Sequence, residues 1–508
     1  MMREEILNEI QQFDEEMGRE HLAHSVGLKD DLNMSAIFEK HPSLFARENL
    51  TLVTALLKAS SMPETRKRNL LLYDFVVGGI IGNDQKQLID ESSTYEAKAH
   101  IKVKGKTVPF RQASMIVMNE PKRAQRQKIV DALVPTKKKL TSYAKQSLTR
   151  EYALLKKLTG KEYLPYYAFI KQLDYPKIAS YARQFLRETA DDYHRQLDEA
   201  MSSIKVPLND IRKHDLGFYL RAHHFDAYFP KNNLVQTFTK TLAGMGLNIK
   251  KQKNILIDAE DRPKKVPRAF CLPLLIPEEV HLVIKPHGGQ EDYQTILHEG
   301  GHSEHFANTR KDLSYEFKHM GAHNVSETYA FLFEYLVQNP LWLKQFTKMP
   351  AKKEAEFLSF MRFNKLAFLR RYAAKVLYEL KLHESDLHQL DDNFLPTREK
   401  YADVQAMYAD ILTKASHVKY LPIDYLLDVD SGMYSADYFL AWMFEVQLRS
   451  KLVEKFGAKW FMNKKAGAFL KTMWQYGSAG KSQEELALMI GFSGVDPSFL
   501  INEMTQAI

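Results

Sequence analysis

Residues 292–309 read DYQTILHEGGHSEHFANT, and within them positions 298–302 spell HEGGH. If this stretch is a helix, His298 and His302 lie one turn apart on the same face, so both imidazoles can point at one ion. Glu299 then sits roughly 100° around the helix, where its carboxylate can reach the attacking water without binding the metal. Neutral imidazole suits zinc, and a catalytic zinc site uses three protein ligands and a water. The motif therefore predicts a zinc site that needs a third ligand.

Two glycines, Gly300 and Gly301, lie inside this predicted helix. Each costs roughly 1 kcal/mol relative to alanine in a helix interior. That cost indicates that another backbone comes close, either a neighbouring helix or a substrate strand. The apolar flanks, Ile296, Leu297 and Phe306, favour a buried helix.

The third ligand is sought among the acidic residues that follow, Asp312, Glu316, Glu327 and Glu334. Asp312 and Glu316 belong to the polar stretch RKDLSYEFKHM, which is typical of a connecting loop or a helix surface. Glu327 opens the apolar segment SETYAFLFEYLV at residues 326–337, where a buried carboxylate needs a partner such as zinc. The alternative is a carboxylate placed at a helix start by the helix dipole. Glu334 follows two helical turns later, so we expect it to orient a ligand histidine.

A metzincin site is excluded by the residues that follow His302. That class needs a glycine at position 305 and a histidine at position 308. The chain has His305 and Asn308 there. The third ligand must therefore come from another segment.

These motifs resemble those of the gluzincin zinc metallopeptidases, and the nearest match is the oligopeptidase family of thimet oligopeptidase and oligoendopeptidase F. The family pattern H-E-x-G-H-x-x-H, followed later by two glutamates seven residues apart, is matched by His298, Glu299, Gly301, His302, His305, Glu327 and Glu334. The resemblance covers roughly residues 260–450. RAFC at residues 268–271 is similar to the family's strand that lines the cleft and pairs with the substrate backbone. The resemblance thus implies substrate contacts from Ala269, Phe270, Cys271 and His305.

A further segment, SGMYSADYFLAWMFEV at residues 431–446, resembles the family's tyrosine-rich C-terminal motif. Tyr434 and Tyr438 match two of its tyrosines, and we expect one of them to donate a hydrogen bond to the transition-state oxyanion. Ordinary packing is the alternative for both. Ala441 stands where the family has another tyrosine, and Val429 where it has a histidine. The nearby candidates for those missing groups are Asp428, Tyr425 and His417.

Helical periodicity predominates along the chain. It predicts helices over residues 4–17, 48–60, 175–205, 354–384 and 435–456. IKVKGKTVPF, at residues 101–110, is typical of a hairpin around a Lys-Gly turn. A second β segment covers residues 268–286, where VHLVI is the strand and two prolines, Pro273 and Pro277, confine the preceding stretch to an edge or an irregular run.

With the resemblance, these elements predict a mainly α protein of ellipsoidal shape. A deep substrate channel is expected between two lobes, with a small β-sheet beside the active-site helix. Residues 1–250 would form a helical N-terminal lobe and residues 251–508 the zinc-binding catalytic lobe, both contributing to one channel.

Composition limits the class and the compartment. The 508 residues are 45% hydrophobic and 26% charged, which is ordinary for a globular protein. The single cysteine, Cys271, excludes an intrachain disulfide and fits a reducing compartment. No apolar run approaches the roughly 18 residues that span a bilayer, and the start MMREEILNEIQQF lacks the apolar core of a secretory signal. We therefore expect a cytoplasmic protein without a membrane partner. The net charge of +8 is interpreted as a solvated surface, without a nucleic-acid partner.

The function expected from these features is zinc-dependent hydrolysis of peptide bonds in short peptides, with one Zn²⁺ ion. One alternative is a metallocarboxypeptidase of the helical thermostable type, whose signature at the third ligand is His-Glu-Ser-Gln where this chain has Val-Ser-Glu-Thr. Another is a catalytically weak peptide-binding protein of peptidase ancestry, motivated by Val429 and Ala441. The choice between endopeptidase and carboxypeptidase action, the side-chain specificity and the oligomeric state are not predicted.

Overall fold

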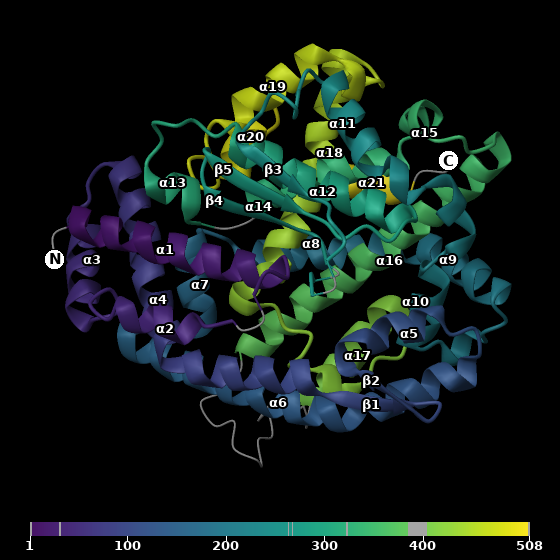
Figure 1. Ribbon diagram of the computed structural model, residues 1–508, viewed down its shortest axis with the longest axis horizontal. Coiled ribbons are helices and arrows are strands. Elements are labelled where there is room, and N and C mark those ends of the chain that lie inside the picture. The colour runs from purple at the N-terminus through teal and green to yellow at the C-terminus, as the bar shows by residue number, and fades with distance from the viewer. Residues whose placement is uncertain are drawn as a thin grey trace. The chain divides into compact units, whose positions relative to one another are not determined.

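The computed structural model describes residues 3–29, 32–262, 264–266, 268–321, 324–384 and 404–505. Within these residues the protein is mainly α-helical and has two small sheets (Figure 1). The predicted mainly α class is therefore confirmed. None of the helices in the described part of the chain is long and apolar enough to cross a membrane.

The chain groups into two compact units, and each is built from separated stretches. Unit 1 comprises Met1–Ile80, His223–Arg362 and Leu440–Asn502, and unit 2 comprises Ile81–Ala222, Phe363–Phe439 and Glu503–Ile508. The chain passes from one unit to the other between Ala222 and His223 and also within four helices, which are α4 (Pro63–Lys98), α16 (Ala351–Glu384), α18 (Tyr434–Phe456) and α21 (Ser498–Thr505). The division into lobes at residue 250, and the channel between them, stay predictions.

Unit 1 holds the three-stranded sheet and the helix that carries HEGGH. Its complete elements are α1 (Arg3–Ser25), α2 (Met34–Lys40), α3 (Arg47–Ala59), α11 (Leu234–Gly244), β3 (Ile255–Asp258), β4 (Phe270–Leu275), β5 (Glu279–Val283), α12 (Gln290–Ala307), α13 (Tyr315–His319), α14 (Asn324–Glu334), α15 (Pro340–Phe346), α19 (Lys464–Trp474) and α20 (Gln483–Met489). The strand order is β3-β5-β4, with β3 parallel and β4 antiparallel to β5. β4 is thus an edge strand, as its prolines predicted. Both β4 and β5 contact α12, which confirms the small sheet beside that helix.

Helices α12 and α14 pack closely side by side in unit 1 (Figure 1). A Cβ atom added to Gly301 would lie 2.4 Å from the backbone oxygen of Tyr329 on α14. A Cβ added to Gly300 would lie 2.3 Å from the ring of Phe238 on α11. Neighbouring helices therefore make the close approach that the two glycines predicted. At Gly301 this approach places α12 against the backbone of α14.

The interpretation of RKDLSYEFKHM as a loop or a helix surface is wrong at Glu316. This residue lies on α13, and its side chain is fully buried. Arg3 and Arg68 both donate to its carboxylate, Arg68 through Nε at 3.3 Å. A buried carboxylate requires such partners. The two arginines lie 313 and 248 residues away in sequence, so no local pattern could reveal the pairing.

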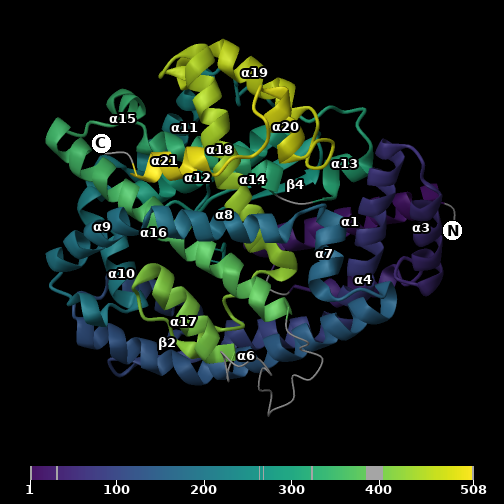
Figure 2. The same ribbon diagram turned by 180° about the vertical axis from the view of Figure 1, so that it is seen from behind.

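Unit 2 holds the hairpin and most of the remaining helices. Its complete elements are β1 (His100–Val103), β2 (Lys106–Pro109), α5 (Ala113–Asn119), α6 (Arg123–Thr159), α7 (Tyr163–Lys171), α8 (Tyr175–Glu188), α9 (Ala190–Ser203), α10 (Lys213–Leu220) and α17 (Val404–Ser416). Helices α9 and α10 lie next to each other, as Figure 2 shows from behind. The antiparallel β1–β2 pair turns at Lys104 and Gly105, both with positive φ, which confirms the predicted hairpin.

The helix predicted over residues 175–205 is two helices in the structure, α8 and α9. They meet at Thr189, whose ψ of 6° departs from the helical range. The guanidinium of Arg370 donates to Thr189 Oγ1 and to the backbone oxygen of Leu186, both at 2.7 Å. Arg370 thereby satisfies carbonyl and hydroxyl groups at the end of α8. Because Arg370 lies 181 residues from Thr189 in sequence, the periodicity of the segment could not show these contacts at the break.

Candidate metal centre

Helices α12 and α14 bring the three predicted metal ligands together. In the described residues, His298, His302 and Glu327 form the one group of three or more potential ligand side chains whose ligand atoms all lie within 4.8 Å of one another. The Nε2 atoms of His298 and His302 lie 3.4 and 3.6 Å from Oε2 of Glu327. We call these three residues the His–Glu cluster. Two imidazole nitrogens and one carboxylate form the donor set of a catalytic zinc site.

The other ring nitrogen of each histidine has its own partner. Nδ1 of His298 donates to Oε2 of Glu334 at 2.8 Å, and Nδ1 of His302 is hydrogen-bonded to Oγ of Ser326 at 2.7 Å. Gln294 in turn donates to the second oxygen of Glu334 at 3.4 Å. Such hydrogen bonds select the tautomer that presents Nε2 to a metal and fix the ring orientation. Glu334 thus lies beside His298, one of the predicted ligands, and its role in orienting a bound ligand stays a prediction.

Ser326 is a supporting residue that sequence reasoning missed. Its hydroxyl lies between two rings, 2.7 Å from His302 Nδ1 and 3.1 Å from His305 Nδ1. It precedes Glu327 directly on α14, so the same helical turn supplies one predicted ligand and a hydrogen-bond partner for another. Its position next to the predicted third ligand was the only available signal.

The charges of the cluster determine its protonation. Burial alone would lower the pKa of His298, but the carboxylates of Glu327 and Glu334 raise it well above its usual value. Burial alone would raise the pKa of Glu327, and the two imidazoles instead hold it well below its usual range. Glu327 is therefore an ionised carboxylate at neutral pH, which is the form that binds a metal.

Glu299 lies on α12 between the two histidines and is partly buried. Burial and the charge of the Glu299 carboxylate together raise the pKa of the Cys271 thiol on β4. Cys271 also accepts a hydrogen bond from Ser303 Oγ at 3.4 Å. Cys271 and Phe270 are partly buried on the edge strand, whereas Ala269 just before them is buried. Of the predicted substrate-binding residues, Phe270 and Cys271 thus keep accessible surface, and the charge of Glu299 acts on the Cys271 thiol.

His305 has no exposed surface. Its ring is partly stacked on Phe306, with centroids 5.0 Å apart, and burial lowers its pKa to about 3, so the ring is neutral. The substrate contact that the resemblance implied for His305 would require exposure that this side chain lacks. Its contact with Ser326 places it instead among the groups that hold His302 in position.

The predicted tyrosine pair, Tyr434 and Tyr438, belongs to unit 2 and begins α18. From residue 432 to residue 439, these are the two side chains that are not buried. Their ring centroids lie 4.9 Å apart, and Tyr438 is stacked on Tyr372 of α16 at 5.3 Å. Both phenol rings therefore reach the surface of one helix face, as their four-residue spacing suggested.

The turn that leads into the tyrosine pair is held by buried groups that sequence reasoning did not identify. The carboxylate of Glu379 accepts the backbone N–H of Asp430 at 2.8 Å and the hydroxyl of Ser435. Gly432, with φ of 63°, donates its N–H to the phenol oxygen of Tyr163 at 2.8 Å. Burial raises the pKa of Glu379 to about 8. These partners come from α16 and α7, so only the folded chain brings them to the turn.

The three residues named as substitutes for the missing family groups already have partners in unit 2. Asp428 accepts hydrogen bonds from Arg371 and from the Tyr408 phenol, the latter at 2.7 Å. His417 contacts the ring of His194, with centroids 4.0 Å apart, and Tyr425 is buried. Their contacts are those of packing and ion pairing within the unit.

Comparison with known proteins supports this fold assignment at the level of structure. Neither a model of a known protein family nor a curated protein sequence matches the chain. Among solved structures, a protein assigned as an oligoendopeptidase F from Bacillus anthracis str. Ames matches with a TM-score of 0.70 and 14% identity, over 96% of this chain and 87% of that one. A second structure assigned as an oligoendopeptidase F matches with a TM-score of 0.68 and 15% identity, over 97% and 88%. PZ peptidase A, solved with an inhibitor, matches with a TM-score of 0.67 and 15% identity, over 95% and 88%.

The chain therefore has the fold of these helical peptidase structures. This confirms, at the level of the fold, the resemblance to the oligopeptidase family that its motifs suggested.

Proposed function

We propose that the protein is a zinc-dependent peptidase that hydrolyses peptide bonds in short peptides. The observation that carries this proposal is the His–Glu cluster, whose ligand atoms lie within 4.8 Å of one another on two packed helices. The likeness of the fold to oligoendopeptidase F and PZ peptidase supports the choice of peptides as substrates.

The donor set of the cluster fits one Zn²⁺ ion. His298 and His302 would bind it through Nε2 and Glu327 through its carboxylate, because the Nδ1 atoms are engaged by Glu334 and Ser326. Three protein ligands leave one coordination position open, which distinguishes a catalytic from a structural zinc site. A zinc ion bound there would supply a Lewis acid for the scissile carbonyl and lower the pKa of water.

Glu299 is the proposed general base. It does not belong to the cluster but lies between its two histidines on α12. Its carboxylate takes a proton from the attacking water as the water oxygen bonds to the carbonyl carbon. It then returns that proton to the nitrogen of the leaving amine as the C–N bond breaks. Glu334 and Ser326 keep the two imidazoles oriented throughout.

The start of the edge strand β4, Phe270 and Cys271, together with the preceding Ala269, is the proposed backbone partner of the peptide. An edge strand carries backbone groups that can pair with an added extended peptide. Tyr434 and Tyr438 are the proposed donors to the oxyanion, a role that the resemblance implies and that the predictions in the Discussion test.

Glu299→Gln tests the function directly. The amide keeps the size of the side chain but cannot take a proton, so we expect cleavage of a quenched fluorescent peptide library to fall by about 10²–10⁴-fold. Zinc content measured on the same preparations should be unchanged, because Glu299 is not a ligand. If both proteins bind zinc and cleave equally little peptide, the proposed enzymatic function is contradicted, and a peptide-binding protein is favoured. Equal and substantial cleavage would remove Glu299 as the base.

A further inference from the structure

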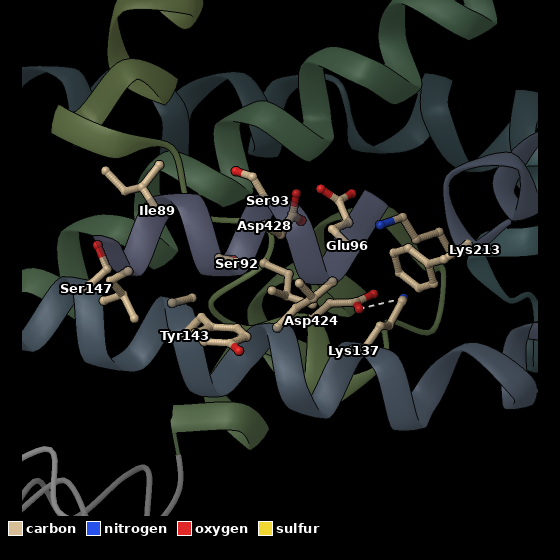
Figure 3. A pocket seen from close by; sticks show the side chains of 15 residues that line it. Ile89, Ser92, Ser93, Glu96, Lys137, Tyr143, Ser147, Lys213, Asp424 and Asp428 are labelled. Atoms are coloured by element: carbon tan, nitrogen blue, oxygen red, sulfur yellow. Dashed lines mark hydrogen bonds and ion pairs between the residues drawn. The ribbon is translucent and has the colours of Figure 1, made fainter. Parts of the chain in front are cut away.

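Unit 2 contains a cavity of about 540 Å³ that the proposed hydrolysis does not use. Figure 3 shows it between α4, α6 and the segment that carries Asp424 and Asp428. Its volume lies within the roughly 300–1,000 Å³ that small-molecule sites occupy. Every residue that lines it belongs to unit 2.

One part of the cavity wall is apolar. Leu88 and Ile89 of α4 and Leu140 of α6 contribute, together with Phe110 and Leu427. Ile89 is 51% exposed and Leu427 is 37% exposed, which is high for large aliphatic side chains. Apolar groups that remain exposed inside a concave wall favour a ligand with an apolar body.

Charged side chains gather at the other end of the cavity, where Figure 3 shows Glu96, Lys137, Lys213 and Asp424 near one another and Ile89 far from them. Each carboxylate there already has a cationic partner. Asp424 binds Lys137 at 2.7 Å, and Glu96 binds Arg111 at 3.2 Å. Asp428, which also lines the cavity, is paired with Arg371.

Lys213 differs from these groups. In the part of the chain that the structure describes, its ammonium forms no ion pair and lies over the ring of Tyr420, 5.5 Å from the centroid. The side chain of Lys213 is exposed, and protein atoms also surround its ammonium. This crowding lowers the pKa of Lys213, and the carboxylates of Asp428 and Asp424 offset part of the shift. Because these two carboxylates are already paired with Arg371 and Lys137, Lys213 is one cation more than the ion pairs at this end of the cavity, and such a cation can bind an anion.

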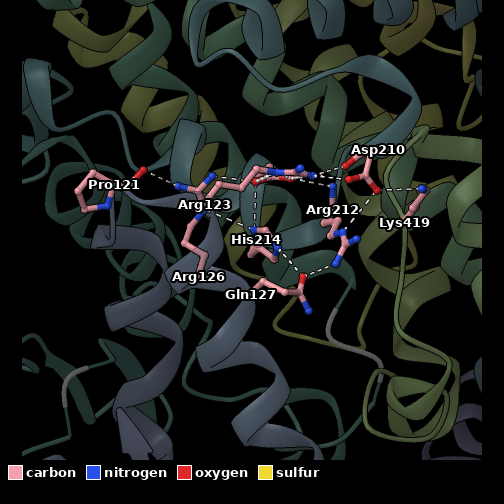
Figure 4. A network of polar contacts seen from close by, with 9 residues as sticks. Pro121, Arg123, Arg126, Gln127, Asp210, Arg212, His214 and Lys419 are labelled. Carbon is pink, nitrogen blue, oxygen red and sulfur yellow. Dashed lines mark hydrogen bonds and ion pairs between the residues drawn. The ribbon is translucent and has the colours of Figure 1, made fainter. Parts of the chain in front are cut away.

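The position of Lys213 is fixed by its neighbours on α10. Asp215 accepts hydrogen bonds from Arg126 at 2.8 Å and from Arg123, and it also accepts the backbone N–H of Arg212. His214 contacts Gln127 of α6 at 3.0 Å (Figure 4). The residues on both sides of Lys213 are thus tied to α6, the helix that forms the cavity wall. The backbone that carries Lys213 is therefore positioned before any ligand binds.

We propose that this cavity binds an amphiphilic carboxylate, with the anionic group at Lys213 and the apolar body along Leu88, Ile89 and Leu140. Two sources share this chemistry. One is a medium-chain aliphatic acid, and the other is the C-terminal carboxylate of an apolar peptide. This site is independent of the metal centre, because all its residues lie in unit 2 and the cluster lies in unit 1.

Titration calorimetry with the full-length protein tests the proposal, and it needs no enzymatic activity. Sodium decanoate, kept below the concentration at which it forms micelles, probes the aliphatic source, and acetyl-Leu-Leu with a free carboxylate probes the peptide source. We expect saturable binding of one of the two, whereas decylamine and acetyl-Leu-Leu-amide bind at least about tenfold more weakly, because a charge-assisted hydrogen bond is worth about 1.5–3 kcal/mol.

Two variants locate the site. Lys213→Met should weaken binding of the favoured carboxylate by at least about tenfold, and Ile89→Asp should weaken it as well by placing a charge on the apolar wall. Lys138→Met is the matched control, because Lys138 is an exposed lysine of α6 that does not line the cavity. It should bind like the wild type. Circular dichroism melting shows whether each variant is folded, and Ile89→Asp still tests the site if Lys213→Met is not.

Three results would overturn the proposal. The first is no saturable binding of either carboxylate by the wild type. The second is equal binding of the carboxylates and their cationic or neutral counterparts. The third is equal binding by folded Ile89→Asp and Lys138→Met proteins.

Discussion

The His–Glu cluster of unit 1 and the tyrosine pair of unit 2 are built on the same sequence device, two like residues four positions apart on a helix. In the cluster, both imidazoles face a carboxylate from a second helix, and their outer nitrogens are held by Glu334 and Ser326. In the tyrosine pair, both rings remain partly exposed and contact each other and Tyr372. The same four-residue spacing thus brings two side chains toward a third residue in unit 1 and leaves two side chains partly exposed in unit 2.

The difference between the two regions comes from what packs against each helix. Gly300 and Gly301 let α11 and α14 approach α12, so the facing helix can place Glu327 beside the two histidines. At the turn before Tyr434, Glu379 and Tyr163 instead accept hydrogen bonds from backbone N–H groups. They contact the turn and not the phenol rings, which stay partly exposed. A pair of side chains on one helix face converges with a third side chain only where a second helix packs close to that face.

The largest effect is expected from Glu327→Ala, which removes the ligand that the facing helix contributes. We expect zinc affinity to fall by about a thousandfold or more, beyond the 10–100-fold that a supporting residue costs, and peptidase activity to disappear with it. Zinc analysis after dialysis against a weak chelator measures the change. Glu291→Ala, an exposed carboxylate on the first turn of α12, is the control and should keep its metal. Full zinc occupancy in Glu327→Ala would show that the third ligand is assigned incorrectly.

A smaller effect is expected at the tyrosine pair. Tyr434→Phe and Tyr438→Phe each remove one phenol hydroxyl and keep the ring, and we expect one of the two to lower kcat by about 10²–10³-fold with little change in KM. Tyr372→Phe controls for the loss of a hydroxyl from the same aromatic group. If all three variants keep wild-type kcat, packing explains the pair, and the resemblance does not extend to this segment.

How much the sequence could predict differs between the same two regions. The spacing of His298 and His302, and the placement of Glu327 in an apolar helix, were sufficient to name residues that the structure brings within 4.8 Å. The mainly α class, the hairpin and the edge position of β4 were also accessible, because periodicity, turn residues and prolines act locally. β3 was missed because four residues are too few to show alternation.

What the sequence could not predict depends on contacts between distant segments. Ser326 and Glu379 act through hydrogen bonds to residues 24 and 51 positions away, and Glu316 is buried by two arginines from the first 70 residues. Nothing in the local pattern around these three residues distinguishes a buried, partnered side chain from a solvated one. Only packing decides between them.

The close packing behind the cluster is tested by a pair of glycine variants. Gly301→Ala would bring a Cβ atom to 2.4 Å from a backbone oxygen of α14, so the helices must separate, and we expect a loss of about 1–3 kcal/mol in the free energy of unfolding. Gly78 lies exposed in α4 with no atom within 4 Å of an added Cβ, so Gly78→Ala should gain up to about 1 kcal/mol. Denaturant titration measures both. A stable Gly301→Ala protein with unchanged zinc affinity would show that the close approach is not needed.

The smallest effect on zinc affinity is expected at the residues that form hydrogen bonds to the two histidines but do not belong to the His–Glu cluster. Ser326→Ala removes the acceptor of the His302 Nδ1–H but leaves all three ligands, so zinc affinity should fall by about tenfold, the lower end of the range for supporting residues. Glu334→Ala should lower zinc affinity further, by up to about a hundredfold, because the partner lost by His298 is charged.

Ser303→Ala is the matched control. Ser303 is a buried serine of α12 whose hydroxyl contacts Cys271 and the backbone oxygen of Glu299, and not the ring of His298 or His302. Competition with a zinc-binding dye ranks the three variants. If Ser326→Ala and Ser303→Ala have the same zinc affinity, the Ser326 hydroxyl does not orient the His302 ring. The ring is then oriented by coordination and packing alone.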